Sequence, residues 1–575
     1  MELRSLATTD AVQPLLLRSL GALIAVLVVR ILYKGYIERG RVGSLKAQGI
    51  PVLPHSLLYG HLPIFADFRA VHPPDINAYQ FHNWLATNSK KYFPDQDRLP
   101  PVVYVDLWPV AKSLAIVYDQ TAAAQFIQAK SLPKDHVNFE FMKPLTNGLD
   151  IVSAKGGDLW KRWRSRFNPG FSSRNLTAML PELIEEVQVF ADGLKNLAGK
   201  NGEWGSVFQL ENRTTNLTFD VIVRASLDLR LHEQSRSSPS PFKTVLMKQI
   251  EMMNLIVNSA RAFSLGKMPW DHAAIRRNNQ ELREILLPHI ENKMHSDINA
   301  SQKKTIVDLA LKYIDKDDPN ASPEKPDTEF IDRLIANVKA FIFAGHDTTS
   351  STICFMVKLL QDHPESLARL QAEHDSVLGS DPDKAVDILS ASPHLLYSLP
   401  YTLGVVKETL RLNPLAATIR DSMSIPGFTI TAPGSPIKYP LNGFGAWVSA
   451  PGIMRRSDYW PRPDEFLPER WVAVEGDPLH VDNKDTWLPF SLGPRNCVGM
   501  ELAMIELRLV CVVIARTFDI REAWEEWDKI QGPKATPTHL VNGKRLYGIG
   551  NSTVHPKDGM PVHVRMRSYR SATSS

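Results

Sequence analysis

FSLGPRNCVG, at residues 490–499, is the most informative stretch of this chain. Its cysteine, Cys497, directly precedes a strong helical pattern over residues 500–518. The dipole and free N–H groups at a helix N-terminus favour a thiolate, the form of cysteine that binds metals. Gly493 and Gly499 allow the backbone to come close, with no Cβ to hold off a planar ligand. The pattern predicts a metal-binding cysteine beside a flat ligand; the plainer alternative is a buried core cysteine between turn glycines.

The other two cysteines are Cys354 and Cys511, so the chain has 3 cysteines in 575 residues. This small, odd number argues against a disulfide-stapled secreted protein and favours a reducing compartment. With 43% hydrophobic and 22% charged residues, the composition is that of a globular protein and excludes wholesale disorder or a multi-span transporter. The net charge of +4 is too balanced to indicate nucleic-acid binding. Because no low-complexity linker interrupts the interior, we expect one large domain.

The decapeptide resembles the haem-binding loop of cytochromes P450, the haem-thiolate monooxygenases. The resemblance implies haem b (iron protoporphyrin IX, heme b) as the cofactor and Cys497 as the proximal iron ligand. It also implies that Phe490, Arg495 and Gly499 contact the haem. A thiolate ligand pushes electron density onto the iron and favours O–O cleavage. The fold implied is that of cytochromes P450, mainly α with a minor β region, and a single N-terminal transmembrane helix precedes it.

A helix with a charged pair is predicted upstream, at residues 401–412, which read YTLGVVKETLRL. Glu408 and Arg411 are three residues apart, so they share one helix face and can pair. Alone, such a pair is usually a solvated surface pair. By the resemblance, both join Arg470, in FLPERW at residues 466–471, in a buried structural triad behind the haem.

Apolar residues recur at steps of three and four from Glu329 to Asp362, which predicts a helix long enough to cross the domain. Its middle, AGHDTT at residues 344–349, resembles the oxygen-activating segment of the family. The resemblance implies that Thr348 and Asp347 form a catalytic proton-delivery pair, and that Phe343 and Ala344 line the substrate pocket. The plainer alternative is a crossing of two helices at small residues, with an exposed aspartate.

Two further regions are similar to haem-contacting parts of the family. WKRWR, at residues 160–164, resembles a helix that bonds a haem propionate, which implies this role for Trp160 and Arg164. Arg420 is a further expected propionate partner. The family also implies O2 as co-substrate and a separate electron donor, NADPH–cytochrome P450 reductase, because the chain leaves no room for a fused flavin domain.

An apolar run, LLLRSLGALIAVLVVRILY at residues 15–33, predicts a transmembrane anchor whose arginines snorkel to the interface. The alternatives are a signal peptide and a surface-lying helix. The basic excess that follows puts the body in the cytoplasm by the positive-inside rule. We therefore expect a lumenal N-terminus (1–14), the anchor (15–33), a basic, proline-containing hinge (34–60), a haem monooxygenase domain (61–560) and a partly disordered C-terminal tail (561–575), on the endoplasmic reticulum membrane.

Periodicity predicts mainly helices between residues 151 and 410, short strands near residues 424–440, strands and turns from residue 528 onward, and an inserted loop near residues 531–551. The function expected is insertion of one oxygen atom from O2 into a lipophilic small molecule, in fungal secondary metabolism such as polyketide or terpenoid tailoring. The alternatives are a fatty-acid or xenobiotic hydroxylase, a haem-thiolate isomerase, dehydratase or peroxygenase, and a membrane-tethered haem-binding sensor without turnover.

Overall fold

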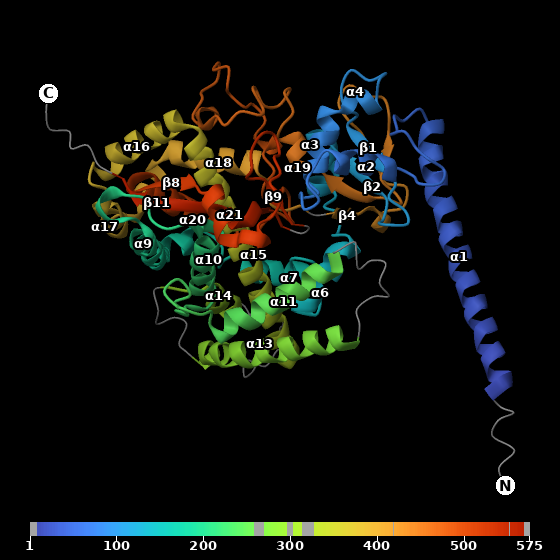
Figure 1. Ribbon diagram of the computed structural model, residues 1–575, viewed down its shortest axis with the longest axis horizontal. Coiled ribbons are helices and arrows are strands. Elements are labelled where there is room, and N and C mark those ends of the chain that lie inside the picture. The colour runs from blue at the N-terminus through green and yellow to red at the C-terminus, as the bar shows by residue number, and fades with distance from the viewer. Residues whose placement is uncertain are drawn as a thin grey trace, which may run out of the picture.

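The structure is a computed structural model that describes residues 9–257, 269–295, 303–312, 327–417, 419–550 and 553–567. Helices make up most of the body and small sheets complete it, which confirms the predicted mainly α fold with a minor β region (Figure 1). The helices of the body are α2 (Leu62–Ala70), α3 (Gln80–Thr87), α4 (Ser89–Tyr92), α5 (Gln120–Ala124), α6 (His136–Thr146), α7 (Asp158–Phe167), α8 (Ser173–Ala178), α9 (Leu180–Leu197), α10 (Leu210–Leu227), α11 (Pro241–Val257), α13 (Pro269–His295), α14 (Ile306–Lys312), α15 (Thr328–Asp362), α16 (Pro364–Leu378), α17 (Ala385–Ala391), α18 (Pro400–Leu412), α19 (Ala450–Ile453), α20 (Met500–Thr517) and α21 (Trp524–Gln531).

The largest sheet has the strand order β1-β2-β7-β4, with β2 and β7 parallel and the other pairs antiparallel. A second sheet, β3-β11-β8, brings the C-terminal strand between two others. Two further pairs, β5–β6 and β9–β10, are each formed by two antiparallel strands that follow one another in the sequence. The strands are β1 (Val102–Val105), β2 (Leu114–Val117), β3 (Phe208–Gln209), β4 (Ile419–Asp421), β5 (Thr429–Ile430), β6 (Tyr439–Pro440), β7 (Gly445–Val448), β8 (Phe518–Glu522), β9 (Gly548–Ile549), β10 (His555–Pro556) and β11 (Pro561–Met566).

Helix α15 is the central element of the body, and its bounds confirm the helix predicted for residues 329–362. Its first turn is capped by Asp327, whose carboxylate accepts the N–H of Phe330 at 2.7 Å. Every residue from Leu334 to Phe343 is buried, because α6, α10, α18 and α20 pack around the helix. The long helix therefore brings its polar middle into the centre of the molecule.

The C-terminal region differs from the predicted one. Helix α21 extends to Gln531, into the start of the segment where mainly strands and turns are predicted. The predicted tail begins with β11, which pairs with β8 over five residues from Val562 to Met566, so the folded body extends beyond residue 560. The pairing buries Val562 and Val564, an alternation that a six-residue strand shows only weakly in the sequence. The serine-rich end, residues 568–575, lies outside the described residues.

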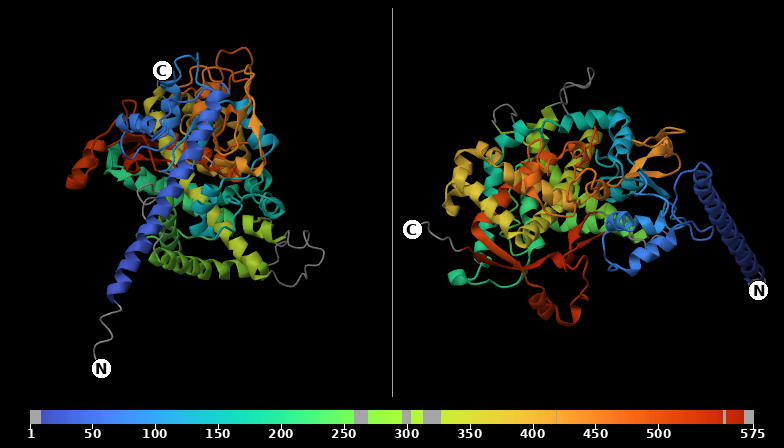
Figure 2. Two further views of the ribbon diagram at one scale, coloured as in Figure 1. Left: turned by 90° about the vertical axis from the view of Figure 1, so that its right-hand side faces the viewer. Right: turned by 90° about the horizontal axis from the view of Figure 1, so that it is seen from above.

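Helix α1 (Thr9–Ala47) stands away from the body for most of its length (Figure 2). Residues 17–47 are long and apolar enough to cross a membrane, which agrees with the predicted single transmembrane helix. The boundaries differ from the predicted ones, because the helix continues without a break through residue 47, where the hinge was expected. Lysine and arginine are good helix formers, so the basic run extends the helix rather than ending it. The segment 1–8 of the predicted lumenal N-terminus lies outside the described residues.

Candidate active site

The loop that carries Cys497 is held in a tight path by its own backbone. The N–H of Cys497 donates to the carbonyl of Phe490 at 2.9 Å, and the N–H of Asn496 donates to that of Gly493 at 3.0 Å. Gly493 has a φ of +78°, and a Cβ there would lie 2.3 Å from the carbonyl oxygen of Ile127. Only glycine fits this position, so the close approach predicted from the sequence is a requirement of the loop.

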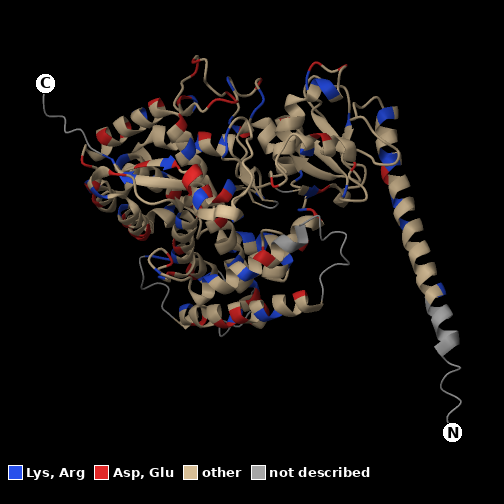
Figure 3. Cartoon of the chain, viewed as in Figure 1, with Lys and Arg blue, Asp and Glu red and all other residues tan. Residues whose placement is uncertain are grey.

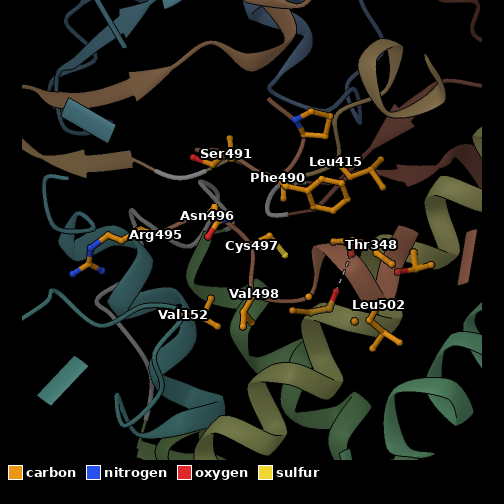
Figure 4. A pocket seen from close by; sticks show the side chains of 18 of the residues that line it. Val152, Thr348, Leu415, Phe490, Ser491, Arg495, Asn496, Cys497, Val498 and Leu502 are labelled. Carbon is orange, nitrogen blue, oxygen red and sulfur yellow. Dashed lines mark hydrogen bonds between the residues drawn. The ribbon is translucent and has the colours of Figure 1, made fainter. Parts of the chain in front are cut away.

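The sulfur of Cys497 opens onto a cavity in the interior of the body (Figure 4). Burial raises the pKa of the Cys497 thiol, while the backbone N–H of Gly499 and the charges of Arg164 and Lys134 act in the opposite direction. A Cβ on Gly499 would lie 4.0 Å from the sulfur, so a larger residue there would begin to cover it. Access to the sulfur is thus kept open by the residue two positions after it.

The cavity has a volume of about 280 Å³ and a predominantly apolar wall. Phe490 and Leu415 approach Cys497 from one side, and Leu502 and Val498 from another (Figure 4). This wall is built by segments that are distant in sequence, chiefly the loop before α7, α15, the segment after α18, the cysteine loop and α20. The further apolar lining residues are Ile127, Ile151, Val152, Phe171, Ile222, Phe341, Leu410, Val448, Ala450, Leu488 and Leu507.

Helix α15 presents one face to this cavity, and Ala344 and Thr348 lie on it as predicted. The hydroxyl of Thr348 donates to the carbonyl of Ala344, one turn earlier, at 2.9 Å. This bond fixes the side chain at the cavity wall, where Figure 4 shows it on the side to which the sulfur of Cys497 points. Gly345 also lines the wall, and a Cβ there would meet Ile222 at 2.9 Å.

Two predicted residues of α15 do not lie at the cavity wall. Phe343 is buried against Phe141, with ring centroids 6.1 Å apart, and does not line this cavity, so its expected place in the substrate pocket stays a prediction. Asp347, four residues later on the same face, is buried and turned toward His555 rather than into the cavity. The physical reason is the helical rotation of about 100° per residue, which places 343 and 347 beside the face that carries 344 and 348.

Four cationic side chains line the cavity: Lys134, Arg164, Arg420 and Arg495. Within the described part of the chain, none forms a salt bridge with a carboxylate. One amino group of Arg420, Nη2, is buried without a hydrogen-bond partner among those residues. Burial, with the neighbouring Arg495, lowers the pKa of Arg420 to about 10, and burial with Arg420 and Arg495 lowers that of Lys134 to about 7. Uncompensated buried cations are costly unless an anion joins them.

These residues fit the cofactor that the sequence implies. A haem is a flat, mostly apolar group with two carboxylates at one edge and a metal at its centre. The cavity offers an apolar wall for the ring, a cysteine sulfur for the metal and uncompensated cations, including the unpartnered Nη2 of Arg420, for the carboxylates.

Trp160 and Arg164 both lie at this cavity, where they also contact the protein itself, and their expected role toward a haem propionate stays a prediction. The indole N–H of Trp160 donates to the carbonyl of Ile151 at 3.1 Å, so its one donor is already used. Arg495 stacks on the Trp160 ring, with 4.1 Å between the guanidinium carbon and the ring centroid. Arg164 donates to the carbonyl and side-chain oxygens of Asn496 at 3.0 and 2.9 Å. Both residues therefore brace the cysteine loop and its arginine.

The three residues of the predicted triad come together in the core, with all side chains fully buried. The carboxylate of Glu408 accepts from Arg411 at 2.8 and 2.9 Å and from Nε of Arg470 at 2.9 Å. The indole N–H of Trp471 and the backbone N–H of Leu467 complete its shell, at 3.0 and 3.1 Å. Although burial raises the pKa of Glu408, the two arginines outweigh it and hold the pKa below its ordinary value.

Several residues at the site have no clear signal in the sequence. Lys134 precedes a short helix in an irregular segment, and only the fold brings it to the cavity. Glu506, on α20, also lines the cavity, and burial raises its pKa well above the ordinary value. Phe341 was recognisable only as one of many apolar residues of its helix. Asn496, which accepts hydrogen bonds from Arg164, directly precedes Cys497, so its place in the loop is the one signal in the sequence that pointed to one of these residues.

The comparisons with known proteins agree with this geometry. The family model described as Cytochrome P450 matches residues 77–542. Among curated proteins, the chain is 34% identical to cytochrome P450 monooxygenase polC of Polytolypa hystricis, over 95% of each chain. It is 30% identical to cytochrome P450 monooxygenase acrF of Aspergillus aculeatus, over 81% of this chain and 94% of that one.

A solved structure, the haem domain of cytochrome P450DA, aligns with a TM-score of 0.66 at 20% identity, over 90% of this chain and 97% of that one. This likeness shows the fold, and the match to the family over most of the chain, with relatives from fungi, shows the kinship. The chain belongs to the cytochrome P450 family, among its fungal monooxygenases.

Proposed function

We propose that the chain binds haem b, that the sulfur of Cys497 would ligate its iron, and that Arg420, Arg495 and Lys134 would hold its carboxylates. The observation that carries the proposal is the open sulfur of Cys497 in a cavity that contains cations without carboxylate partners. When bound, a haem with a thiolate ligand activates O2 for insertion of one oxygen atom into a C–H bond. Arg164 and Trp160 support this site by bracing Asn496 and Arg495.

The residues of α15 prepare the opposite side of the cavity. The small side chains at Ala344 and Gly345 leave room for O2 and for the substrate next to it. The hydroxyl of Thr348, anchored on the Ala344 carbonyl, holds a proton at the cavity wall and can pass it inward. Asp347, the neighbouring carboxyl, resupplies that proton. The predominantly apolar wall limits bulk water in the cavity, which favours proton entry along this route.

The apolar wall favours a lipophilic small molecule as the substrate. We place the reaction in fungal secondary metabolism, as polyketide or terpenoid tailoring, on the likeness to fungal monooxygenases. Hydroxylation of fatty acids or xenobiotics is the second candidate, because the same wall suits an alkyl chain. The presence of both Thr348 and Asp347 favours an oxygenase over a haem sensor, which needs no route for protons.

The experiment supplies purified holoenzyme with NADPH, cytochrome P450 reductase, 18O2 and an extract of the fungal metabolome. We expect one labelled oxygen atom in a product and the other in water. Thr348→Ala should lower product formation by about 100-fold while hydrogen peroxide accumulates, and Thr348→Ser, which keeps the hydroxyl, should restore it. Consumption of NADPH without labelled product in the wild type would contradict an oxygenase.

We further propose that α1 anchors the chain in the endoplasmic reticulum membrane with the body in the cytoplasm, where the NADPH–cytochrome P450 reductase delivers electrons. The apolar stretch within α1 and the basic residues toward its junction with the body support this orientation (Figure 3). The chain carries six Asn-x-Ser/Thr sequons, at Asn175, Asn212, Asn216, Asn299, Asn320 and Asn551. All should stay unglycosylated in the native host, and glycans on the body would reverse the topology.

A further inference from the structure

A histidine from the C-terminal region reaches the acid beside Thr348. His555 lies on β10, and its Nε2 is 3.6 Å from Oδ1 of Asp347, an ion-pair distance. Its other ring nitrogen, Nδ1, is 2.8 Å from Oε1 of Glu211 on α10. The hydroxyl of Thr553 lies 3.2 Å from Nε2. Three elements that are far apart in the sequence thus meet at one imidazole ring.

The three side chains His555, Glu211 and Asp347 become less exposed from the surface toward the interior. The His555 side chain is 34% exposed, that of Glu211 17% and that of Asp347 11%, so exposure falls toward α15. The second carboxylate oxygen of Asp347, Oδ2, is buried and has no hydrogen-bond partner within the described ranges. His555 therefore holds Oδ1 of Asp347, while Oδ2 has no hydrogen-bond partner among the described residues.

The charges around His555 favour its protonated form. Burial acts against the charge, but the hydrogen bond to Glu211 and the charges of Asp347 and Glu211 raise the pKa of His555 to about 9. The other titratable group nearby, His346 on α15, is buried, and burial lowers its pKa. At neutral pH His555 is thus an imidazolium between two carboxylates, able to give up a proton and to recover one from water.

A purely structural tie between β10 and the helices is the plainer reading. That reading accounts for the hydrogen bond to Glu211. A structural contact alone, however, would not require His555 to reach Asp347, the residue before Thr348, or leave one oxygen of Asp347 without a partner. A proton donor requires both, together with contact with solvent. Within the described ranges, His555 forms the ion pair with Asp347, while the adjacent His346, whose pKa burial lowers, interacts with Asp347 through its charge.

We propose that His555, positioned by Glu211, supplies protons from solvent to Asp347 and through it to Thr348. This inference rests on the oxygenase function proposed above. In each transfer the Nε2–H bond of His555 breaks and an O–H bond forms on Asp347. The ion pair is then neutral, which frees the carboxyl to pass the proton inward, and His555 takes a proton from water. Two such protons, with two electrons from the reductase, convert the oxygen atom that does not enter the substrate into water.

The test compares His555→Asn and Glu211→Gln with the wild type and with His563→Asn. His563 is the matched control: a histidine on neighbouring β11 with an acidic neighbour, Glu526 at 3.6 Å, but without contact to Asp347. With haem-loaded protein, reductase and NADPH in the absence of substrate, we expect His555→Asn to slow NADPH consumption about tenfold. A larger share of the consumed NADPH should then appear as peroxide, and His563→Asn should match the wild type.

The pH profile separates a relay from a structural tie. In the wild type, NADPH consumption should fall as pH rises through about 9, where His555 loses its proton. Glu211→Gln removes a charge that favours the imidazolium, so it should move this midpoint to lower pH. His555→Asn should abolish the dependence. The same midpoints, measured independently of turnover, should appear in the 13C NMR titration of His555 in labelled protein.

The failures are distinguishable. If wild-type protein has no thiolate-ligated haem or consumes no NADPH, the proposed function fails. If the wild type turns over and both variants share its rate, peroxide share and pH midpoint, the relay is wrong. Should His555→Asn not fold, Glu211→Gln decides alone: an unshifted midpoint in both turnover and NMR refutes the proposal.

Discussion

Lys134 illustrates how a single side chain can be selected for a ligand rather than for the fold. It is buried and lines the cavity, and its charge is opposed by burial and by Arg420 and Arg495 more strongly than Asp150 and Cys497 favour it. In the protein alone this arrangement is unfavourable, which is why its pKa is lowered to about 7. A bound dianion reverses the balance, because it compensates Lys134, Arg420 and Arg495 at once.

Replacing Lys134 by methionine should therefore stabilise the haem-free protein but weaken its hold on haem. The haem-free protein should gain about 1–3 kcal/mol of unfolding free energy, because an uncompensated buried charge is removed. Haem should dissociate faster from the variant, since one cation no longer faces its carboxylates. Urea unfolding of the haem-free protein and haem transfer to apomyoglobin measure the two effects. Lys130→Met, at an exposed lysine nearby, is the control and should change neither. Equal haem retention in Lys134→Met would remove Lys134 from the site.

The packing of α18 shows how one helix is locked to the segment behind the cavity. Arg411 donates not only to Glu408 but also to the carbonyls of Met454, Pro463 and Glu465, at 2.6 to 3.0 Å. Arg470 donates to two more carbonyls of the same irregular segment. The ion cluster thus holds loop backbone that has no regular hydrogen bonding of its own.

Glu408→Gln should cost about 3–5 kcal/mol of unfolding free energy, because it leaves two buried guanidinium groups without their charge partner. The matched control is Glu465→Gln, since Glu465 and Arg462 are also three residues apart but more than half exposed. This pair is screened by water, and its loss should leave the unfolding midpoint unchanged.

The pH dependence of this cost follows from the lowered pKa of Glu408. The carboxylate's contribution is complete above its ordinary pKa of 4.5 and is lost as pH falls through the lower folded value. The stability difference between wild type and Glu408→Gln should therefore shrink in acid. A difference that stays constant to low pH would contradict the ion-pair account.

Across the whole molecule, the anchor and the body form one continuous piece at their junction. The buried Arg39, on α1, pairs with the fully buried Asp106 and donates to the carbonyls of Leu58 and Trp108 at 3.2 and 3.0 Å. Val42 and Leu45 of the same helix are 2% exposed. If α1 crosses a membrane as proposed, a helix fixed in this way would set the tilt of the body relative to that membrane.

Arg39→Met should loosen this junction without detaching the protein from membranes, because the apolar part of α1 is unchanged. Spin labels at Tyr36→Cys and Val71→Cys, both highly exposed positions, report the distance between helix and body. We expect a narrow distance distribution in the wild type and a broad one in Arg39→Met. Lys46→Met, at an exposed lysine of α1, is the control. A narrow distribution in both would show that apolar contacts alone fix the anchor.

Sequence reasoning succeeded where the determinants are local. The cysteine loop, the long helix α15 and the Glu408–Arg411 spacing are each contained in a short segment, and all appear in the structure. It failed for features that depend on rotation about a helix or on distant segments. The single step from Ala344 to Phe343 turns a side chain away from the cavity, and the partners of Asp347 come from β10 and α10.

The central claim, that Cys497 ligates a haem through its thiolate, is tested most directly by the spectrum of the reduced protein with CO. The wild type should show the strongly red-shifted Soret band of a thiolate-ligated haem. Cys497→Ala should lose that band, whereas Cys354→Ala and Cys511→Ala should keep it. A red-shifted band that persists unchanged in Cys497→Ala would contradict the account.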